Sequence, residues 1–154
     1  MQRKAQAIWR GSLQLGKGEI STLSGALKGV PYTFNTRFSE TPGTNPEELI
    51  AAAHASCFAM ACSAGFSDKG FEPENLEVTA NVTLQKLGSA WAVTSSLLQL
   101  KAQVAGVPLD QFTSIVEEAK NNCPISKLLN LNIALEAHLE EAPPPRPWAP
   151  PPPQ

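Results

Sequence analysis

The chain has 154 residues, of which 42% are hydrophobic, and a formal net charge of −2. This length and composition suit one domain with its own core, and a near-neutral charge without a basic stripe argues against nucleic acid as the main partner. We expect neither a membrane span nor a secretory signal, because no apolar run approaches about 18 residues free of polar side chains and no hydrophobic region follows the basic start.

Three strands are predicted before the first long helix. Residues 5–13 and 19–25 flank a glycine-bearing turn and predict a β-hairpin. Residues 30–38 follow another glycine and predict a third strand, which carries Arg37 near its end. A loop then leads to the helix.

The long helix is predicted over residues 45–64. Asn45 is a favoured N-cap, Pro46 suits the first helical position, and Glu48 stands where a capping box requires it. Gly65 is expected to end the helix. Because nearly every turn is small or apolar, we expect this helix to be buried on most sides, with other backbone close by.

The second half of the chain predicts a hairpin, an amphipathic helix and a last strand. A bulge is expected where Leu97 and Leu98 interrupt the alternation of the second of these strands. The order βββ-α-ββ-α-β indicates an α+β fold with antiparallel sheet. The elements are strands over 74–87 and 91–105, a helix over 108–122, a short helical turn over 123–130 and a strand over 131–139. The apolar stripe of the second long helix comprises Leu109, Phe112, Ile115, Val116 and Ala119.

The last residues differ in composition from the rest. Residues 142–154 are mostly proline, which supplies no backbone N–H to a helix or a sheet. We expect a folded domain over residues 1–141 and a disordered, proline-rich tail over 142–154 in extended polyproline II conformation. The tail is either an appendage or a ligand for a proline-reading domain.

The three cysteines, an odd number, do not indicate a disulfide framework and favour a reducing cytoplasm. Cys57 lies in mid-helix and is either a small hydrophobe in the core or a reactive thiol. Cys62 lies about 140° further around the helix, so these two cannot bridge while the helix is intact. Cys123 precedes a proline at a helix junction, where a helix N-terminus favours a thiolate and where a cap or loop thiol is the alternative.

A thiol in an apolar helix needs a nearby cation to ionise. Arg37 is the candidate, because its planar fork can hold a thiolate, a peroxide oxygen and a carboxylate, although a surface position is the alternative. Glu47 is not needed by the capping box and is free to orient an arginine. His54, one turn before Cys57, is either its base or, more commonly for such a residue, a packed histidine. No metal-ligand spacing and no phosphate-binding loop is present, so no metal or cofactor is expected.

Glu47 and Cys57 lie on the same helix, about 15 Å apart along its axis. If both serve one site, the glutamate must come from a second copy of the chain. Two such helices packed antiparallel would bring each Glu47 towards the thiol of the other chain, and alanine-rich faces permit that close packing. The sequence therefore predicts a homodimer with this helix in its core.

Three segments carry a family resemblance: PYTFNTRF, GTNPEELIAAAHASCFAMA and NNCPISKLL. They resemble the OsmC/Ohr family of thiol peroxidases, osmotically inducible and organic-hydroperoxide-resistance proteins, over residues 5–139. The arginine in NTRF is similar to that of the OsmC branch, since the Ohr branch carries its arginine nearer the N-terminus. The resemblance implies an OsmC-like domain over residues 1–141, with antiparallel sheets around a central helix in an intertwined homodimer.

The resemblance also implies roles for matching residues. Cys57 looks like the peroxidatic cysteine, Cys123 like the resolving cysteine, Arg37 like the activating arginine and Glu47 like its carboxylate partner, whereas Cys62 matches no catalytic position. The implied reaction reduces organic hydroperoxides, and hydrogen peroxide less well, in oxidative or osmotic stress. It passes through a Cys57 sulfenic acid and a Cys57–Cys123 disulfide, which a lipoyl-type or other dithiol reduces, without metal or haem. A non-enzymatic redox sensor and an inert scaffold are the alternatives.

Overall fold

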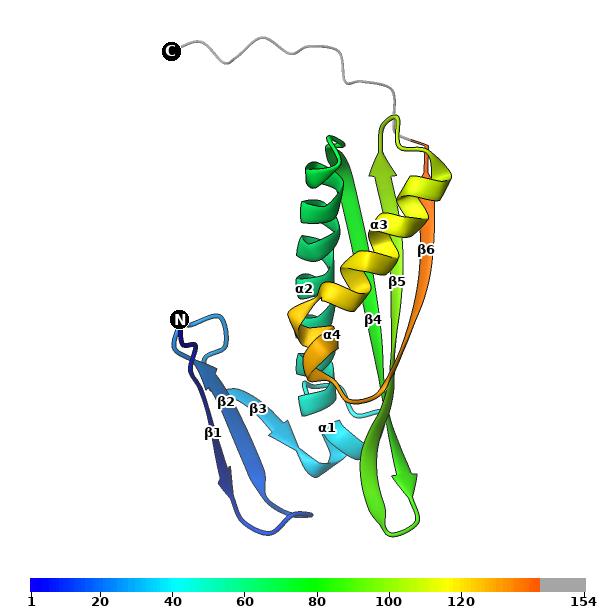
Figure 1. The fold of residues 1–154 in the computed structure, drawn as a ribbon. Helices are drawn as coiled ribbons and strands as arrows, with labels where there is room; N and C mark the ends of the chain where they lie inside the picture. Colours follow the sequence, from blue (N-terminus) through cyan, green and yellow to red (C-terminus); the bar gives the residue numbers. More distant parts are fainter. Residues whose placement is uncertain (142–154) are drawn as a thin grey trace, which may run out of the picture. The chain divides into compact units, whose positions relative to one another are not determined.

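The computed structural model describes residues 1–141, so the predicted proline-rich tail lies outside the described residues. The chain divides into two compact units, the first ending at Ile50 and the second beginning at Ala51. The predicted order of strands and long helices is confirmed, with one short helix, α1, in addition. The elements are β1 (Ala5–Arg10), β2 (Lys17–Thr22), β3 (Val30–Thr33), α1 (Phe34–Phe38), α2 (Pro46–Asp68), β4 (Pro73–Leu87), β5 (Ala90–Val104), α3 (Leu109–Asn122), α4 (Pro124–Leu128) and β6 (Asn132–Glu140) (Figure 1).

The first unit contains a three-stranded antiparallel sheet in the order β1-β2-β3. The predicted third strand is too long, because the chain leaves β3 at Thr33 and forms helix α1 over the segment that carries Arg37. A capping box causes this change: the Thr36 N–H donates to Thr33 Oγ1 (3.2 Å), and the Thr33 N–H donates to Thr36 Oγ1 (3.0 Å). Arg37 therefore projects from a helix and not from a strand.

Helix α2 begins as predicted and ends later than predicted. The Glu48 N–H donates to Asn45 Oδ1 (2.8 Å), which confirms the N-cap, while the Glu48 carboxylate accepts from Thr44 Oγ1 (2.9 Å). Gly65 does not end the helix. A Cβ at Gly65 would lie 3.0 Å from Ile115 Cγ2, so glycine here permits close packing of α2 on α3. The chain leaves α2 at Asp68 and turns through Gly70, whose φ is +81°.

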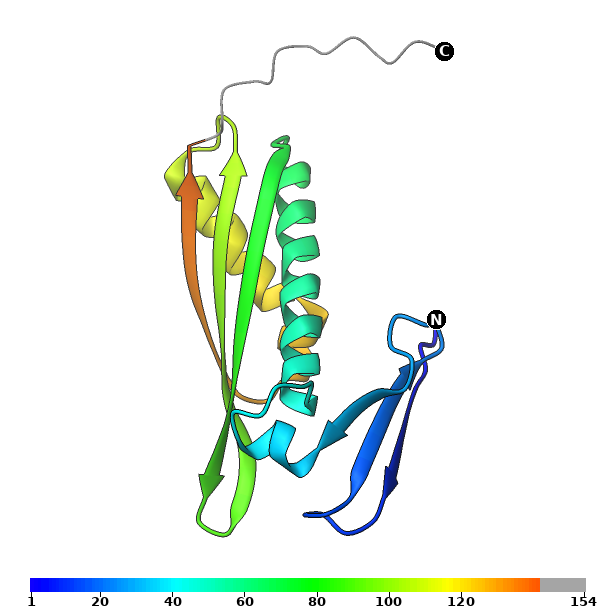
Figure 2. The same ribbon diagram turned by 180° about the vertical axis from the view of Figure 1, so that it is seen from behind.

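The second unit contains a sheet in the order β4-β5-β6, with α2 and α3 packed on one of its faces (Figure 1, Figure 2). Strands β4 and β5 are antiparallel, as expected. Strands β5 and β6 are parallel, contrary to the expectation of purely antiparallel sheets. The reason is that α3 and α4 form a crossover, which returns the chain to the end of the sheet where β5 begins. The expected bulge at Leu97 and Leu98 is also absent. The register shifts lie at Glu74 on β4 and at Thr94 on β5, so Leu98 faces the core in regular alternation.

One face of α2 enters the core and the other is exposed in the single chain. His54, Phe58, Cys62 and Phe66 are buried at intervals of four residues, against the inward-facing side chains of β5 and α3. In the single chain, the exposed residues between Ile50 and Gly65 are all small or apolar: Ala52, Ala53, Ser56, Met60 and Ala64. By length and composition α2 could also cross a membrane, which the sequence did not predict, although core helices of soluble proteins meet the same criterion.

Replacing Phe112 by alanine should lower the free energy of unfolding by about 3–5 kcal/mol. Its ring is 1% exposed and stacks on Phe66, with ring centroids 5.8 Å apart. Leu109 belongs to the predicted apolar stripe of α3 but is 68% exposed, so Leu109→Ala is a matched control that should change stability by less than about 0.5 kcal/mol. Urea unfolding followed by circular dichroism measures both variants, and equal losses would contradict this assignment of the two helix faces.

Candidate active site

Two of the three thiols are in contact in the second unit. Cys57 lies on the middle of α2 and is half-buried, whereas Cys123 is fully buried at the junction between α3 and α4. The side chains of Cys57 and Cys123 are hydrogen-bonded, with the two sulfurs 3.1 Å apart. A disulfide requires a separation of about 2.05 Å, so the sulfurs need to approach by only about 1 Å to bond.

The surroundings of the two thiols act on them in opposite directions. Burial raises the pKa of Cys57, and the contact with Cys123 raises it further, against a smaller lowering by the Ile125 N–H. Burial also acts to raise the pKa of Cys123, but hydrogen bonds from the Ser126 N–H, Cys57, the Ser126 hydroxyl and the Ile125 N–H outweigh it, so that this pKa is lowered. The second unit by itself therefore favours a thiolate on Cys123, and Cys57 needs a positive charge to react as a thiolate.

Cys62 lies apart from this contact. Its side chain is fully buried in the core, and burial, followed by the charge of Cys123, raises its pKa to about 12. At neutral pH it is a small hydrophobic side chain, as the sequence allowed.

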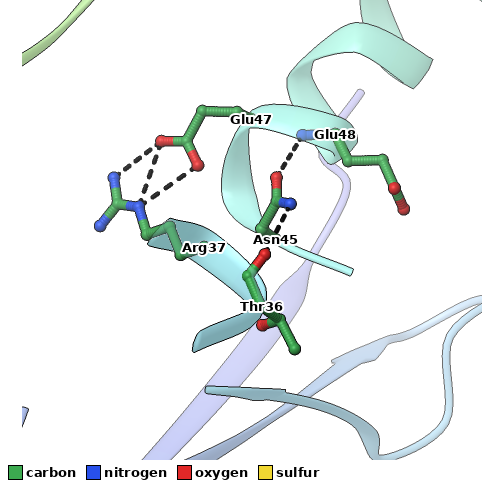
Figure 3. A network of polar contacts seen from close by, with 5 residues as sticks. All are labelled: Thr36, Arg37, Asn45, Glu47 and Glu48. Carbon is green, nitrogen blue, oxygen red and sulfur yellow. Dashed lines mark hydrogen bonds and ion pairs between the residues drawn. The ribbon is translucent and has the colours of Figure 1, made fainter. Parts of the chain in front are cut away.

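Arg37 and Glu47 form an ion pair within the first unit (Figure 3). Arg37 Nη2 donates to Glu47 Oε1 at 2.8 Å, and Arg37 Nε lies 3.2 Å from both carboxylate oxygens. Glu47 is 8% exposed, and the loop behind it is fixed because Asn45 Nδ2 donates to the Thr36 carbonyl (3.0 Å). This two-atom contact orients the guanidinium plane, as predicted for the freer of the two glutamates.

An apolar pocket adjoins the guanidinium of Arg37. Its volume is about 200 Å³, and the Arg37 guanidinium carbon lies 5.2 Å from the centroid of the Phe38 ring. The walls are mostly aromatic or aliphatic: Trp9, Leu13, Tyr32, Thr33, Phe34, Phe38 and Pro46. The pocket can hold a small apolar group next to a fixed positive charge.

His54 is a packed histidine and not the base of a Cys-His pair. Its Nδ1 lies 2.8 Å from Ser96 Oγ on β5, and its Nε2 lies 2.9 Å from Ser126 Oγ on α4. Neither serine was recognised from the sequence. The available signals were a polar residue in the row of inward-facing positions of β5, which continues with apolar residues, and a hydroxyl three residues after Cys123.

The described residues contain no group of three or more His, Cys, Asp or Glu side chains that could hold a metal ion. The predicted site residues thus form two pairs, Cys57 with Cys123 in the second unit and Arg37 with Glu47 in the first. The fold and the sulfur contact together define an α+β protein with a cysteine pair suited to thiol–disulfide chemistry.

Comparison with known proteins agrees with that class. The family model described as OsmC-like protein matches residues 39–138. The chain is 44% identical to the peroxiredoxin OsmC of Escherichia coli (strain K12) over 138 residues, which cover 90% of this chain and 96% of that relative. It is 36% identical to the organic hydroperoxide resistance protein OhrA of Bacillus subtilis (strain 168) over 102 residues, or 64% of this chain and 68% of that relative.

The solved structures agree as well. The crystal structure of the organic hydroperoxide resistance protein OhrB of Bacillus subtilis matches with a TM-score of 0.66 at 25% identity, covering 88% of this chain and 98% of that one. The chain belongs to the OsmC-like protein family. The predicted family is confirmed, and the predicted class of enzyme, a thiol-dependent peroxidase, agrees with these relatives.

Cys62 should be the last thiol to react with iodoacetamide. A pKa of about 12 leaves very little thiolate below that pH, and the buried side chain is inaccessible to the reagent. In native protein at mildly alkaline pH we expect modification of Cys57 and none of Cys62, whereas denatured protein should be modified at all three cysteines. Peptide mass spectrometry over a time course checks this, and equal native rates for Cys57 and Cys62 would refute it.

Proposed function

We propose that this protein is a cysteine-based peroxidase that reduces organic hydroperoxides, and hydrogen peroxide less well, in defence against oxidative and osmotic stress. The observation that carries the proposal is the contact between the sulfurs of Cys57 and Cys123, 3.1 Å apart. The relatives support it, because one is a peroxiredoxin and another an organic hydroperoxide resistance protein.

The proposed reaction has three steps. The Cys57 thiolate attacks the distal oxygen of the hydroperoxide and the O–O bond breaks, so that Cys57 becomes a sulfenic acid. The alkoxide leaves with the electron pair and takes up a proton from solvent to become an alcohol. Cys123 then condenses with this sulfenic acid to a disulfide and releases water. A dithiol, of lipoyl or another type, finally reduces the disulfide by exchange and is itself oxidised.

In this proposal Arg37 supplies the charge that Cys57 lacks in the second unit. A guanidinium keeps its charge at all relevant pH values and can stabilise both the thiolate and the developing negative charge on the departing oxygen. Glu47 holds it in position through the ion pair of 2.8 Å. The apolar pocket beside Arg37 can bind the organic group of a hydroperoxide, which supports an organic hydroperoxide as the substrate.

We infer that each site is shared between two chains of a homodimer. Glu47 and Cys57 are about 15 Å apart along α2, so one chain cannot place both in one hydrogen-bonded group. Because Arg37 is ion-paired with Glu47 of its own chain, the two would be contributed to the thiol of the other chain together. The exposed face of α2 consists of small and apolar residues, which supports the proposal that a second copy of the chain packs against it. We place this dimer in the cytoplasm.

Turnover tests the proposed role of Cys57. Cys57→Ser should lower peroxide consumption with excess dithiol by more than about 1,000-fold, because the nucleophile is lost. Cys62→Ala, a control that leaves the core apolar, should stay within about twofold of wild type. Comparable losses in both variants would show that the thiols are assigned wrongly. Wild-type protein that stops after one equivalent of peroxide would be a redox sensor instead.

Complementation tests the shared site. Heterodimers of Cys57→Ser with Glu47→Gln should regain one working site, made of Cys57 from one chain and the Arg37–Glu47 pair from the other. Heterodimers of Arg37→Lys with Glu47→Gln are the matched control and should stay inactive, since each pair then contains one altered member. Co-expression with two affinity tags isolates the heterodimers. Inactivity of the first combination, or an active monomer, would overturn the shared site.

A further inference from the structure

His54 is fully buried and has a hydrogen-bond partner on each ring nitrogen, yet the proposed reaction does not use it. Its partners Ser96 and Ser126 are also buried, and they come from β5 and α4. Ser126 in turn hydrogen-bonds Cys123 through both its hydroxyl and its backbone N–H. One continuous line of polar contacts therefore runs from Ser96 through His54 and Ser126 to the thiol of Cys123.

The count of protons fixes the direction of these hydrogen bonds. Burial lowers the pKa of His54, which keeps the ring neutral, and a neutral imidazole has one N–H donor and one acceptor nitrogen. When Ser126 donates its single hydroxyl proton to a Cys123 thiolate, its oxygen must accept from His54 Nε2–H. Nδ1 is then the acceptor and receives the proton of the Ser96 hydroxyl. One tautomer of His54 thus supports the thiolate.

We propose that His54 is a positioning residue for disulfide formation. It holds the Ser126 hydroxyl so that the hydroxyl proton points at the sulfur of Cys123. This inference rests on the proposed function. In the step concerned, the Cys123 thiolate attacks the sulfur of the Cys57 sulfenic acid. The S–S bond forms, the S–O bond breaks, and hydroxide leaves with the electron pair and takes up a proton from solvent. Without His54, the Ser126 hydroxyl can turn away and the thiolate loses a charge-assisted hydrogen bond.

The Ser126 hydroxyl acts on the charge of Cys123 together with the Ser126 N–H, Cys57 and the Ile125 N–H. From α2, the thiols of Cys57 and Cys62 face it. On α3, Lys120 is ion-paired with Glu117 (2.7 Å), and Lys127 on α4 is exposed. The inner faces of β4, β5 and β6, as far as the structure describes them, have no ionisable side chain.

The rate of disulfide formation as a function of pH tests the proposal. Stopped-flow measurement follows the reduced protein after one equivalent of an organic hydroperoxide. His54→Leu should form the disulfide about tenfold more slowly near neutral pH, because less Cys123 is ionised there, and should reach the wild-type rate at alkaline pH. Equal slowing at every pH would mark a merely structural role and would overturn the proposal. Ser67→Ala, an exposed substitution on the same helix, should follow the wild-type profile.

Two further variants test whether His54 acts through Ser126. Ser126→Ala should show the same loss and the same recovery at alkaline pH, and adding His54→Leu to it should have no further effect. His54→Gln, which retains an N–H donor, should keep most of the wild-type rate. Additive losses, or a His54→Gln variant as slow as His54→Leu, would contradict the proposal. If His54→Leu does not fold, the single variants Ser126→Ala and His54→Gln still test the proposal.

A titration separates this inference from the proposed function. If the protein does not react with hydroperoxides, wild type forms no disulfide in the stopped-flow experiment. The thiolate absorbance of Cys123 can still be titrated in a Cys57→Ser, Cys62→Ala background, where His54→Leu should raise the pKa of Cys123. An unchanged pKa would overturn the role of His54 whatever the activity of the wild type.

Discussion

The contact between Cys57 and Cys123 is the constraint on which the rest of the site depends. It requires the middle of α2 and the junction between α3 and α4 to meet at 3.1 Å between sulfurs. Gly65 permits the close packing of α2 on α3, and the crossover through α3 and α4 explains why β6 joins the sheet in parallel with β5. The buried face of α2 and the inward side chains of β5 then hold the pair in place.

Burial of this pair creates an electrostatic requirement. It raises the pKa of Cys57, so a thiolate there depends on a cation, whereas backbone N–H groups at the start of α4 lower the pKa of Cys123. In the proposed site the Arg37–Glu47 ion pair supplies that cation, with the guanidinium plane fixed by two contacts. The proposed dimer meets two requirements at once. It brings the Arg37 guanidinium of one chain to Cys57 of the other, and it covers the small and apolar face that α2 exposes in the single chain.

Local patterns in the sequence predicted most of the elements, because capping residues, alternation and the spacing along one helix are local properties. The family resemblance was needed to assign roles to the four candidate residues, which the patterns alone left open. Contacts that join distant segments were not predictable in the same way. The sequence patterns did not predict the capping box that turns the Arg37 segment into a helix, and they predicted a helix end at Gly65, which is a packing position. The parallel pairing of β6 depends on the crossover through α3 and α4. The hydrogen bonds of His54 to serines far away in the chain were missed for the same reason.

The proposed reaction requires that Cys57 and Cys123 of one chain form the redox-active pair. Light and ¹⁵N-labelled chains, unfolded and refolded together so that mixed dimers form, are oxidised with one equivalent of an organic hydroperoxide, digested without reduction and compared by mass spectrometry. We expect a Cys57–Cys123 peptide pair that is entirely light or entirely labelled, with Cys62 free. A lasting sulfenic acid on Cys57, a link to Cys62, or peptide pairs of mixed label would contradict it.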